Sequence, residues 1–168
     1  MMDLSKLPKI IEGISLDTVE ELKKQVTEAK QVYMLGNGGS SAVCSHIAQD
    51  YSKMLGKRAW TFDNASQLTC YSNDFGQIKA YLKWLEHMVD KDGALVILIS
   101  SSGESENILH CARWCENEGI PFIILSGFDE DNSLRRSFNN IAKLEYWVDS
   151  HDYGIVECVH QLFLHSII

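Results

Sequence analysis

The chain has 168 residues, of which 45% are hydrophobic, 23% are charged and two are proline. This length and composition are typical of one globular domain and exclude a disordered or collagen-like chain. The formal net charge of -8 repels nucleic acid and anionic membrane surfaces, so we expect neither as a partner. A small anionic ligand can still bind the free N–H groups of a helix start.

The five cysteines form no CxxC pair, and the polar N-terminal segment does not resemble a secretory signal. These features predict reduced thiols and a cytoplasmic protein. The longest apolar run covers residues 94–99, far short of the roughly 20 residues of a membrane-spanning helix. We therefore expect no association with a membrane.

Apolar residues recur every three or four positions through the first 30 residues, which predicts two helices with a break near residues 13–17. Short apolar runs then alternate with amphipathic stretches of helical period, and these runs cover residues 32–35, 59–62, 94–99, 121–125 and 141–147. Strands that alternate with helices predict a parallel sheet covered on both faces. The expected fold is a single α/β domain over residues 1–168, with N-terminal helices (1–30) before a doubly wound, flavodoxin-like core of five parallel strands (31–168).

In such sheets, ligands bind at the loops that follow the carboxyl ends of the strands. The first such loop reads Gly-Asn-Gly-Gly-Ser-Ser over residues 36–41 and runs into a helix pattern. Its glycines and the helix-start N–H groups suit a phosphate, although a tight turn with a serine N-cap explains the same residues. A P-loop is excluded because its Lys-Ser/Thr is missing, and Ser41 replaces the third glycine of a dinucleotide fingerprint.

The loop after the third apolar run reads Ser-Ser-Ser-Gly-Glu-Ser-Glu-Asn over residues 100–107 and again leads into a helix pattern. Its hydroxyls and helix-start N–H groups form a neutral, donor-rich cup for a phosphate dianion. A serine-rich N-cap region is the alternative. Because a helix cap requires only one hydroxyl, two such loops in one sheet together favour a sugar-phosphate site.

Three segments in this order resemble the SIS (sugar isomerase) domain family, and within it the sedoheptulose 7-phosphate isomerases, also called phosphoheptose isomerases. They are the Gly-Asn-Gly-Gly-Ser loop, the Ser-Ser-Ser-Gly-x-Ser loop, and the Ser-Asn-Asp-Phe-Gly segment at residues 72–76, which we expect to be a loop. The resemblance implies an aldose–ketose isomerase that converts sedoheptulose 7-phosphate to D-glycero-D-manno-heptose 7-phosphate, for heptose synthesis in lipopolysaccharide or capsule. It also implies a homotetramer with shared active sites, in which the N-terminal helices serve oligomer packing.

The resemblance further implies roles for individual residues. The expected substrate-binding residues are Asn37, Gly38, Gly39, Ser40, Asn73, Asp74, Ser100, Ser101, Ser102, Ser105 and Glu157. The expected ligands of one zinc ion per site are His46, Asp50, Glu157 and His165. Asp50 and His165 are also the expected catalytic pair. Asp50 stands where the family has glutamate, and Glu157 stands where it has glutamine.

His46 and Asp50 are four residues apart and therefore share one face of a helix. This spacing alone fits an exposed polar face as well as a metal or proton-transfer site. The isomerisation moves a proton between C1 and C2 through an enediol, so one group must carry that proton and another must shuttle the hydroxyl proton. A carboxylate and an imidazole, here Asp50 and His165, meet this need.

Glu157 and His165 are eight residues apart, about 12 Å along a helix axis. They reach one ion only if the helix bends or if they serve sites in different subunits, and His160 is expected to point elsewhere. The two replaced residues leave three explanations: a working isomerase, an isomerase for another sugar phosphate, or a non-catalytic sugar-phosphate-binding regulator. The retention of four ionisable or metal-binding groups favours catalysis.

Overall fold

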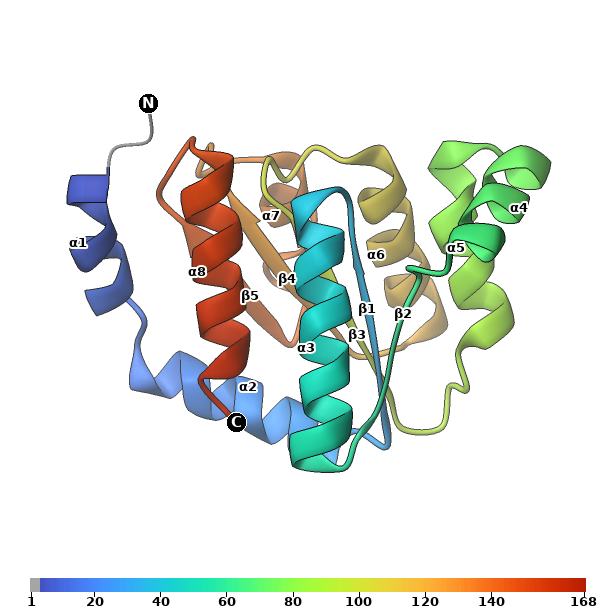
Figure 1. Ribbon diagram of the computed structural model, residues 1–168, viewed down its shortest axis with the longest axis horizontal. Helices are drawn as coiled ribbons and strands as arrows, with labels where there is room; N and C mark the ends of the chain where they lie inside the picture. The colour runs from blue at the N-terminus through green and yellow to red at the C-terminus, as the bar shows by residue number, and fades with distance from the viewer. Residues whose placement is uncertain (1–3) are drawn as a thin grey trace.

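Five parallel strands form one sheet in the computed structural model, which describes residues 4–168 (Figure 1). The order across the sheet is β2-β1-β3-β4-β5. The strands are β1 Gln31–Gly36, β2 Arg58–Thr61, β3 Ala94–Ser100, β4 Phe122–Gly127 and β5 Leu144–Val148. The central strand β3 is buried along its whole length, which explains its uninterrupted apolar sequence, because helices cover both faces of the sheet.

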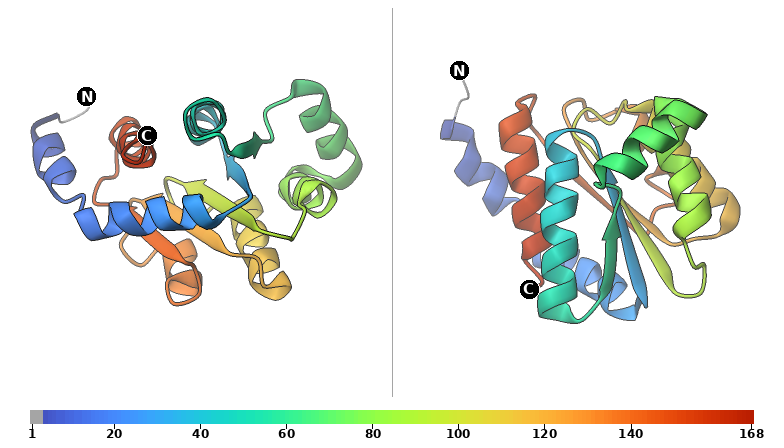
Figure 2. Two further views of the ribbon diagram at one scale, coloured as in Figure 1. Left: turned by 90° about the horizontal axis from the view of Figure 1, so that it is seen from below. Right: turned by 45° about the vertical axis from the view of Figure 1, so that its right-hand side comes forward.

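Helices cover the sheet in two layers (Figure 2). After a 3-10 turn at Leu4–Lys6, the helices are α1 Leu7–Glu12, α2 Leu16–Glu28, α3 Gly39–Leu55, α4 Ala65–Phe75, α5 Gln77–Met88, α6 Glu106–Glu118, α7 Ser133–Phe138 and α8 Tyr153–His165. Buried side chains of α2, α3 and α8 pack on one face, and those of α5, α6 and α7 pack on the other. The sheet is therefore the middle layer of three, and its carboxyl edge is where the helices that follow the strands begin.

The predicted doubly wound α/β fold is confirmed, and so are the two N-terminal helices with a break between them. Residues 1–3 of the predicted domain lie outside the described residues. Helix α2 contributes the fully buried Leu22 and Val26 to the core beside the sheet. The packed core therefore includes part of the segment that we expected to serve oligomer packing.

Two sequence-based boundaries differ from the structure. The segment expected to be a third loop is helical, because residues 72–75 form the last turn of α4, which ends at Gly76 (φ 78°, ψ 154°). That backbone conformation is almost restricted to glycine. The fifth strand begins at Leu144, since the N–H groups of Ile141 and Ala142 instead donate to the carbonyl of Phe138 at the end of α7.

Among the described residues, no helix is both long and apolar enough to cross a membrane.

His160 lies on α8 and is completely buried. The sequence predicted only that it points away from His165 and left open whether it packs in the core or lies at the surface. Its Nε2 lies 3.0 Å from the carbonyl oxygen of Ser126 on β4, so Nε2–H donates to that oxygen. Among the described residues, Nδ1 has no hydrogen-bond partner. Burial lowers the pKa of His160 to about 4, because a charged imidazolium would lose its hydration there.

The buried His160 predicts that acid destabilises the fold. Below about pH 6.5 the unfolded chain protonates this histidine, whereas the folded chain does so only near its pKa of about 4. The free energy of unfolding should therefore fall as the pH decreases between these values, by up to about 3 kcal/mol. Urea denaturation between pH 7.5 and 4.5 measures this loss. In His160→Gln, whose amide can still donate to Ser126, the loss should be smaller, and equal losses in both proteins would contradict the assignment.

Candidate functional site

The loops that follow β1 and β3 meet at the one junction in the sheet where the connections diverge. From β1 the chain passes through α3 to β2, whereas from β3 it passes through α6 to β4, so the two helices lie on opposite faces. This strand order leaves a crevice between the two loops at the carboxyl edge, where open α/β sheets bind their ligands. Both sequence motifs flank this crevice.

Helices α3 and α6 differ from the other helices that follow a strand. Side chains cap α4, α7 and α8, through Asn64, Asn132 and Asp152. The N-cap residues of α3 and α6, Gly38 and Ser105, make no such bond. In α6, Asn107 Oδ1 accepts from the N–H of Ile108, the third residue of the helix (3.1 Å). Their first N–H groups remain available, so the two helix dipoles favour an anion at this junction.

The two loops enclose a cavity of about 240 Å³. The cavity is lined by Asn37, Gly38, Gly39, Ser40, Ile99, Ser100, Ser101, Ser102, Ser105, Tyr153 and Glu157. Nine of these residues are among those predicted to bind substrate. The Ser100 hydroxyl donates to that of Ser105 (3.0 Å), while the hydroxyls of Ser40 and Ser101 lie 3.5 Å apart. This arrangement is a small cup lined by hydroxyls, with a size and polarity suited to a phosphate.

The first loop depends on glycine at two positions. Gly38 has φ +55° and ψ -122°, a conformation that residues with a side chain rarely adopt. At Gly39, a Cβ atom would lie 2.1 Å from a carboxylate oxygen of Glu157. Glu157 therefore lies directly against the start of α3, and burial raises the pKa of its carboxyl group.

An amide pair joins the two loops. Asn37 and Asn107 each donate from Nδ2 to the other's Oδ1, and both distances are 2.9 Å. Both residues also line a neighbouring cavity of about 430 Å³. Asn107 and Tyr153 are not among the site residues predicted from the sequence. Both lie at or near the starts of helices that follow strands, α6 and α8, where ligands of such sheets bind.

Asn73 and Asp74 lie outside the cup. They are exposed in the last turn of α4, where Asn73 Nδ2 donates to Asp74 Oδ1 (2.9 Å). Their neighbour Ser72 lines the larger cavity. Their proposed contact with substrate stays a prediction.

A second group of functional side chains lies between α3 and α8. His46 and Asp50 come from α3 and His165 from the last turn of α8, and one ligand atom from each lies within 4.8 Å of the others. Asp50 Oδ2 is 3.0 Å from His165 Nε2 and 3.4 Å from His46 Nε2. Three of the four predicted metal ligands are thus brought together. Among residues 4–168, this is the one such group of three.

Each ring nitrogen of His165 has a partner, and the two partners define what must lie between His165 and Asp50. Its Nδ1 lies 3.1 Å from the carbonyl oxygen of Gln161, so Nδ1–H donates there. Its Nε2 faces the Asp50 carboxylate, which in its ionised form can only accept. A proton or a cation must therefore lie between the two groups. The arrangement suits both proton transfer and metal binding.

Glu157 does not join this group within one chain. It lies in the first turns of α8, beside Gly39, while His165 lies eight residues further on. The helix is continuous between them, and the eight-residue rise of about 12 Å separates the cup from the group (Figure 1). Of the two ways in which we expected both residues to serve one ion, a bent helix is not observed.

Curated proteins and solved structures resemble this chain, although no family model matches it. It is 30% identical over 164 residues to the phosphoheptose isomerase of Aliarcobacter butzleri (strain RM4018), covering 94% of this chain and 81% of that protein. It is 25% identical over 154 residues to the phosphoheptose isomerase of Fusobacterium nucleatum subsp. nucleatum, covering 89% and 76%.

Among solved structures, the phosphoheptose isomerase of Neisseria gonorrhoeae superposes with a TM-score of 0.86, covering 97% of this chain and 89% of that one at 20% identity. This likeness shows a shared fold. The sequence similarity to the Aliarcobacter protein extends through both glycine- and serine-rich loops and the helices that follow them. The chain belongs to the phosphoheptose isomerase family.

Proposed function

We propose that the protein is an aldose–ketose isomerase that converts sedoheptulose 7-phosphate to D-glycero-D-manno-heptose 7-phosphate through an enediol. The observation that carries the proposal is the presence of two complementary parts in one chain. The first is a cup between two uncapped helix starts. The second is a paired carboxylate and imidazole, Asp50 and His165. The names of the relatives supply the substrate.

The cup binds the phosphate of the substrate. Its donors are the first N–H groups of α3 and α6 and the serine hydroxyls of both loops. Because these donors are neutral, they bind a dianion without the cost of burying a basic side chain. They also explain how a chain with a net charge of -8 can bind an anionic substrate.

Asp50 and His165 carry the protons. One group removes a proton from C1 of the ketose and returns it to C2 of the enediol, while the other moves a proton from the O1 hydroxyl to O2. The hydrogen bond between Nε2 and Oδ2 couples the two groups, and the Gln161 carbonyl holds the orientation of the imidazole. Each proton removed is returned, so the reaction needs no oxidant or reductant.

His46, Asp50 and His165 fit a zinc ion. Two imidazole nitrogens and one carboxylate oxygen form a typical donor set. The Nδ1–H bond of His165 to a backbone carbonyl is the usual outer support of a zinc-bound histidine. When bound, zinc would polarise the oxygens on C1 and C2 of the substrate. In the same proposal, Glu157 supplies a further ligand from a different subunit.

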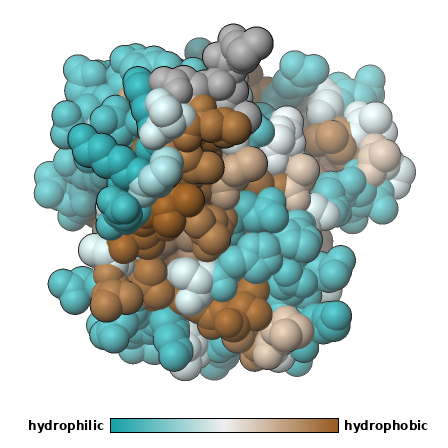
Figure 3. Space-filling view, turned by 60° about the vertical axis from the view of Figure 1, so that its left-hand side comes forward, coloured by the Kyte–Doolittle hydropathy of each residue, from teal (hydrophilic) through white to brown (hydrophobic). Residues whose placement is uncertain are grey.

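We also propose a homotetramer with shared active sites, packed partly through the N-terminal helices. Apolar side chains are exposed on α1, α2 and α8: Ile11 (39%), Leu16 (80%) and Leu162 (44%). The side of the molecule that carries the N-terminal helices has a continuous hydrophobic band (Figure 3). In this proposal, residues 1–168 form one domain, and assembly buries the hydrophobic band and brings the cup of one subunit near the Asp50–His165 pair of another.

The product would enter heptose synthesis for lipopolysaccharide or capsule, in the cytoplasm. The names of the relatives support the heptose pathway. The five cysteines are free thiols, which suits a reducing compartment.

The isomerase activity can be tested by proton NMR of sedoheptulose 7-phosphate in deuterated buffer. We expect the aldose to appear with deuterium at C2, with higher activity in the presence of zinc than after chelation. His165→Ala should lower turnover about a thousandfold, because it removes one proton carrier, while circular dichroism should show an intact fold. His110→Ala, which changes an exposed histidine on α6, is the matched control.

If the sugar binds but neither product nor deuterium exchange appears, the proposal of isomerisation of this sugar is wrong. A non-catalytic sugar-phosphate-binding regulator then explains the binding. If another ketose phosphate turns over while this one does not, the reaction class holds and the proposed substrate is wrong.

The position of Glu157 predicts that it weakens phosphate binding. Its carboxylate lies in the cup against Gly39, where like charge repels a phosphate by about 1 kcal/mol. Glu157→Gln should therefore tighten the binding of inorganic phosphate roughly fivefold by isothermal titration calorimetry. Glu118→Gln, which removes an exposed charge at the other end of α6, should leave the affinity unchanged. Weaker binding in Glu157→Gln would show that the carboxylate supports the cup.

The proposed assembly predicts a mass four times the chain mass of 19.0 kDa by light scattering after size exclusion. Leu16→Asp places a charge on a side chain that is 80% exposed in the single chain, so it should give smaller species without unfolding them. Those species should lose turnover but keep phosphate binding, because the cup lies within one chain. Met88→Asp, at the end of α5, is the control. A wild-type monomer with full activity would exclude shared sites.

A further inference from the structure

The serine-rich loop of the cup is held from behind by residues 127–134, which run from the last residue of β4 into the first turn of α7. The N–H of Gly127 donates to the carbonyl of Ser101 (3.0 Å), and the N–H of Leu134 donates to the carbonyl of Gly103 (2.9 Å). Neither α3 nor the first loop takes part in these bonds. The shape of the serine-rich loop therefore depends on a segment that does not line the cup.

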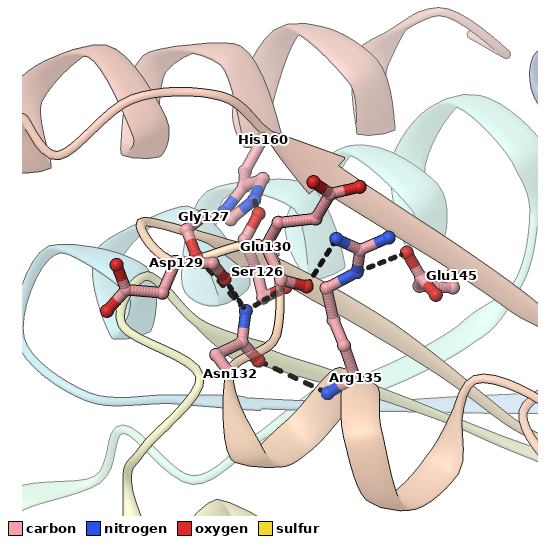
Figure 4. Close-up of polar contacts among 8 residues, drawn as sticks. All are labelled: Ser126, Gly127, Asp129, Glu130, Asn132, Arg135, Glu145 and His160. Atoms are coloured by element: carbon pink, nitrogen blue, oxygen red, sulfur yellow. Dashed lines mark hydrogen bonds and ion pairs between the residues drawn. The ribbon is translucent and has the colours of Figure 1, made fainter.

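Asn132 is the centre of that segment (Figure 4). It is 2% exposed, and its Nδ2 donates to Ser126 Oγ (3.2 Å) and to the carbonyls of Gly127 (3.2 Å) and Asp129 (2.8 Å). Its Oδ1 accepts from the N–H of Arg135 and so caps α7 (3.2 Å). One amide thus closes the loop after β4 and sets the position of the first turn of α7.

The Asn132 side chain also packs against the turn of the serine-rich loop. Gly103 has φ +70°, and a Cβ atom there would lie 1.9 Å from Asn132 Oδ1. The loop backbone can approach the amide this closely only because residue 103 is glycine. Any shift of Asn132 is therefore transmitted to the residues on either side of Gly103, namely Ser102 and Glu104.

Glu104 is an acid within a loop that binds an anion, yet its charge is directed away from the cup. Its carboxylate accepts from the N–H of Ser133 (2.7 Å) and from the Ser133 hydroxyl (2.6 Å). These are charge-assisted bonds to the first residue of α7. On the other side, the N–H of Glu104 donates to the hydroxyl of Ser102 in the cup (3.2 Å). Glu104 therefore connects α7 directly to a cup hydroxyl.

Arg135 connects α7 in turn to the edge strand β5. Its Nε donates to Glu145 (2.7 Å), its Nη1 donates to the carbonyl of Glu130 (2.6 Å), and its guanidinium lies 4.9 Å from the ring centre of Trp147. Both Arg135 and Glu145 are about four-fifths buried, so this pair is less screened by solvent than the surface pairs. The contacts behind the cup therefore connect the serine-rich loop, through α7, to strand β5 of the sheet.

We propose that Asn132 and Glu104 are positioning residues that set the affinity of the cup for phosphate. They hold the serine-rich loop in the shape that directs its hydroxyls and N–H groups at one phosphate. The proposal rests on the proposed function only in that the cup binds a phosphate, and it does not require isomerisation.

The effect of Glu104→Ala separates positioning from simple charge repulsion. If Glu104 acted only as a negative charge near the anion, its removal would tighten phosphate binding. Positioning predicts the opposite, because removal frees the loop from α7. Glu104→Gln keeps an acceptor for the Ser133 N–H and should restore binding, although it lacks the charge.

The experiment measures the Kd for inorganic phosphate by calorimetry, and KM and kcat for sedoheptulose 7-phosphate. Glu104→Ala should raise Kd and KM about tenfold and leave kcat within twofold, while Glu104→Gln should remain within threefold of wild type. Ser133→Ala removes one of the two bonds and should raise Kd about threefold. Asn132→Ala should raise Kd at least as much as Glu104→Ala.

Ser15→Ala is the matched control, because it removes the N-cap of α2, far from the cup, at a similar cost in stability. It should leave Kd unchanged. Unchanged or tighter phosphate binding in Glu104→Ala would overturn the proposal, as would a lower kcat with unchanged KM. If the wild type binds phosphate but does not turn over, the isomerase proposal fails and the Kd values still decide this one. If the wild type binds no phosphate, both fail.

Discussion

The free N–H groups at the starts of α3 and α6 are the constraint on which the rest of the structure depends. In three of the five helices that follow strands, the side chain of the N-cap residue accepts from the first turn, whereas the N-cap residues of these two helices, Gly38 and Ser105, make no such bond. An uncapped helix start exposes donors that need a partner. At the junction of β1 and β3 the two starts are brought together, so one phosphate can satisfy both. Glycines allow the approach, and serines supply the remaining donors.

The requirement for donors without positive charge explains much of the composition of the site. The cup contains hydroxyls, amides and backbone N–H groups, together with one carboxylate from Glu157. Of the two acids in the serine-rich loop, Glu104 is bound by the first turn of α7, and Glu106 lines the neighbouring cavity and not the cup. The local potential at the cup is therefore set by helix dipoles and by the direction of acidic side chains, and the net charge of the chain does not decide it.

The Asp50–His165 pair and the phosphate cup lie at different positions along the axes of α3 and α8. The cup lies at the starts of α3 and α8, while Asp50 and His165 lie about three turns further along. This separation is a direct consequence of straight, parallel helices. It makes a single chain an incomplete enzyme in the proposed mechanism and gives the exposed apolar band a functional reason to be buried by another copy.

The apolar periodicity of the sequence predicted the parallel α/β sheet, and the glycine- and serine-rich loops after two of its strands indicated a phosphate site, because these residues act through local backbone geometry. The nine predicted residues that line the cup were named through the resemblance to the family, and their contact with substrate stays a prediction. The sequence also predicted that His46 and Asp50 share a helix face. Only the tertiary structure decided that His165 meets Asp50, that Glu157 lies against Gly39, and that residues 72–75 are helical. The pairing of Asn132 with Gly103 was likewise invisible in the sequence. These contacts join residues from about 30 to more than 100 positions apart, or depend on where a helix ends, and only packing of the whole sheet fixes such distances.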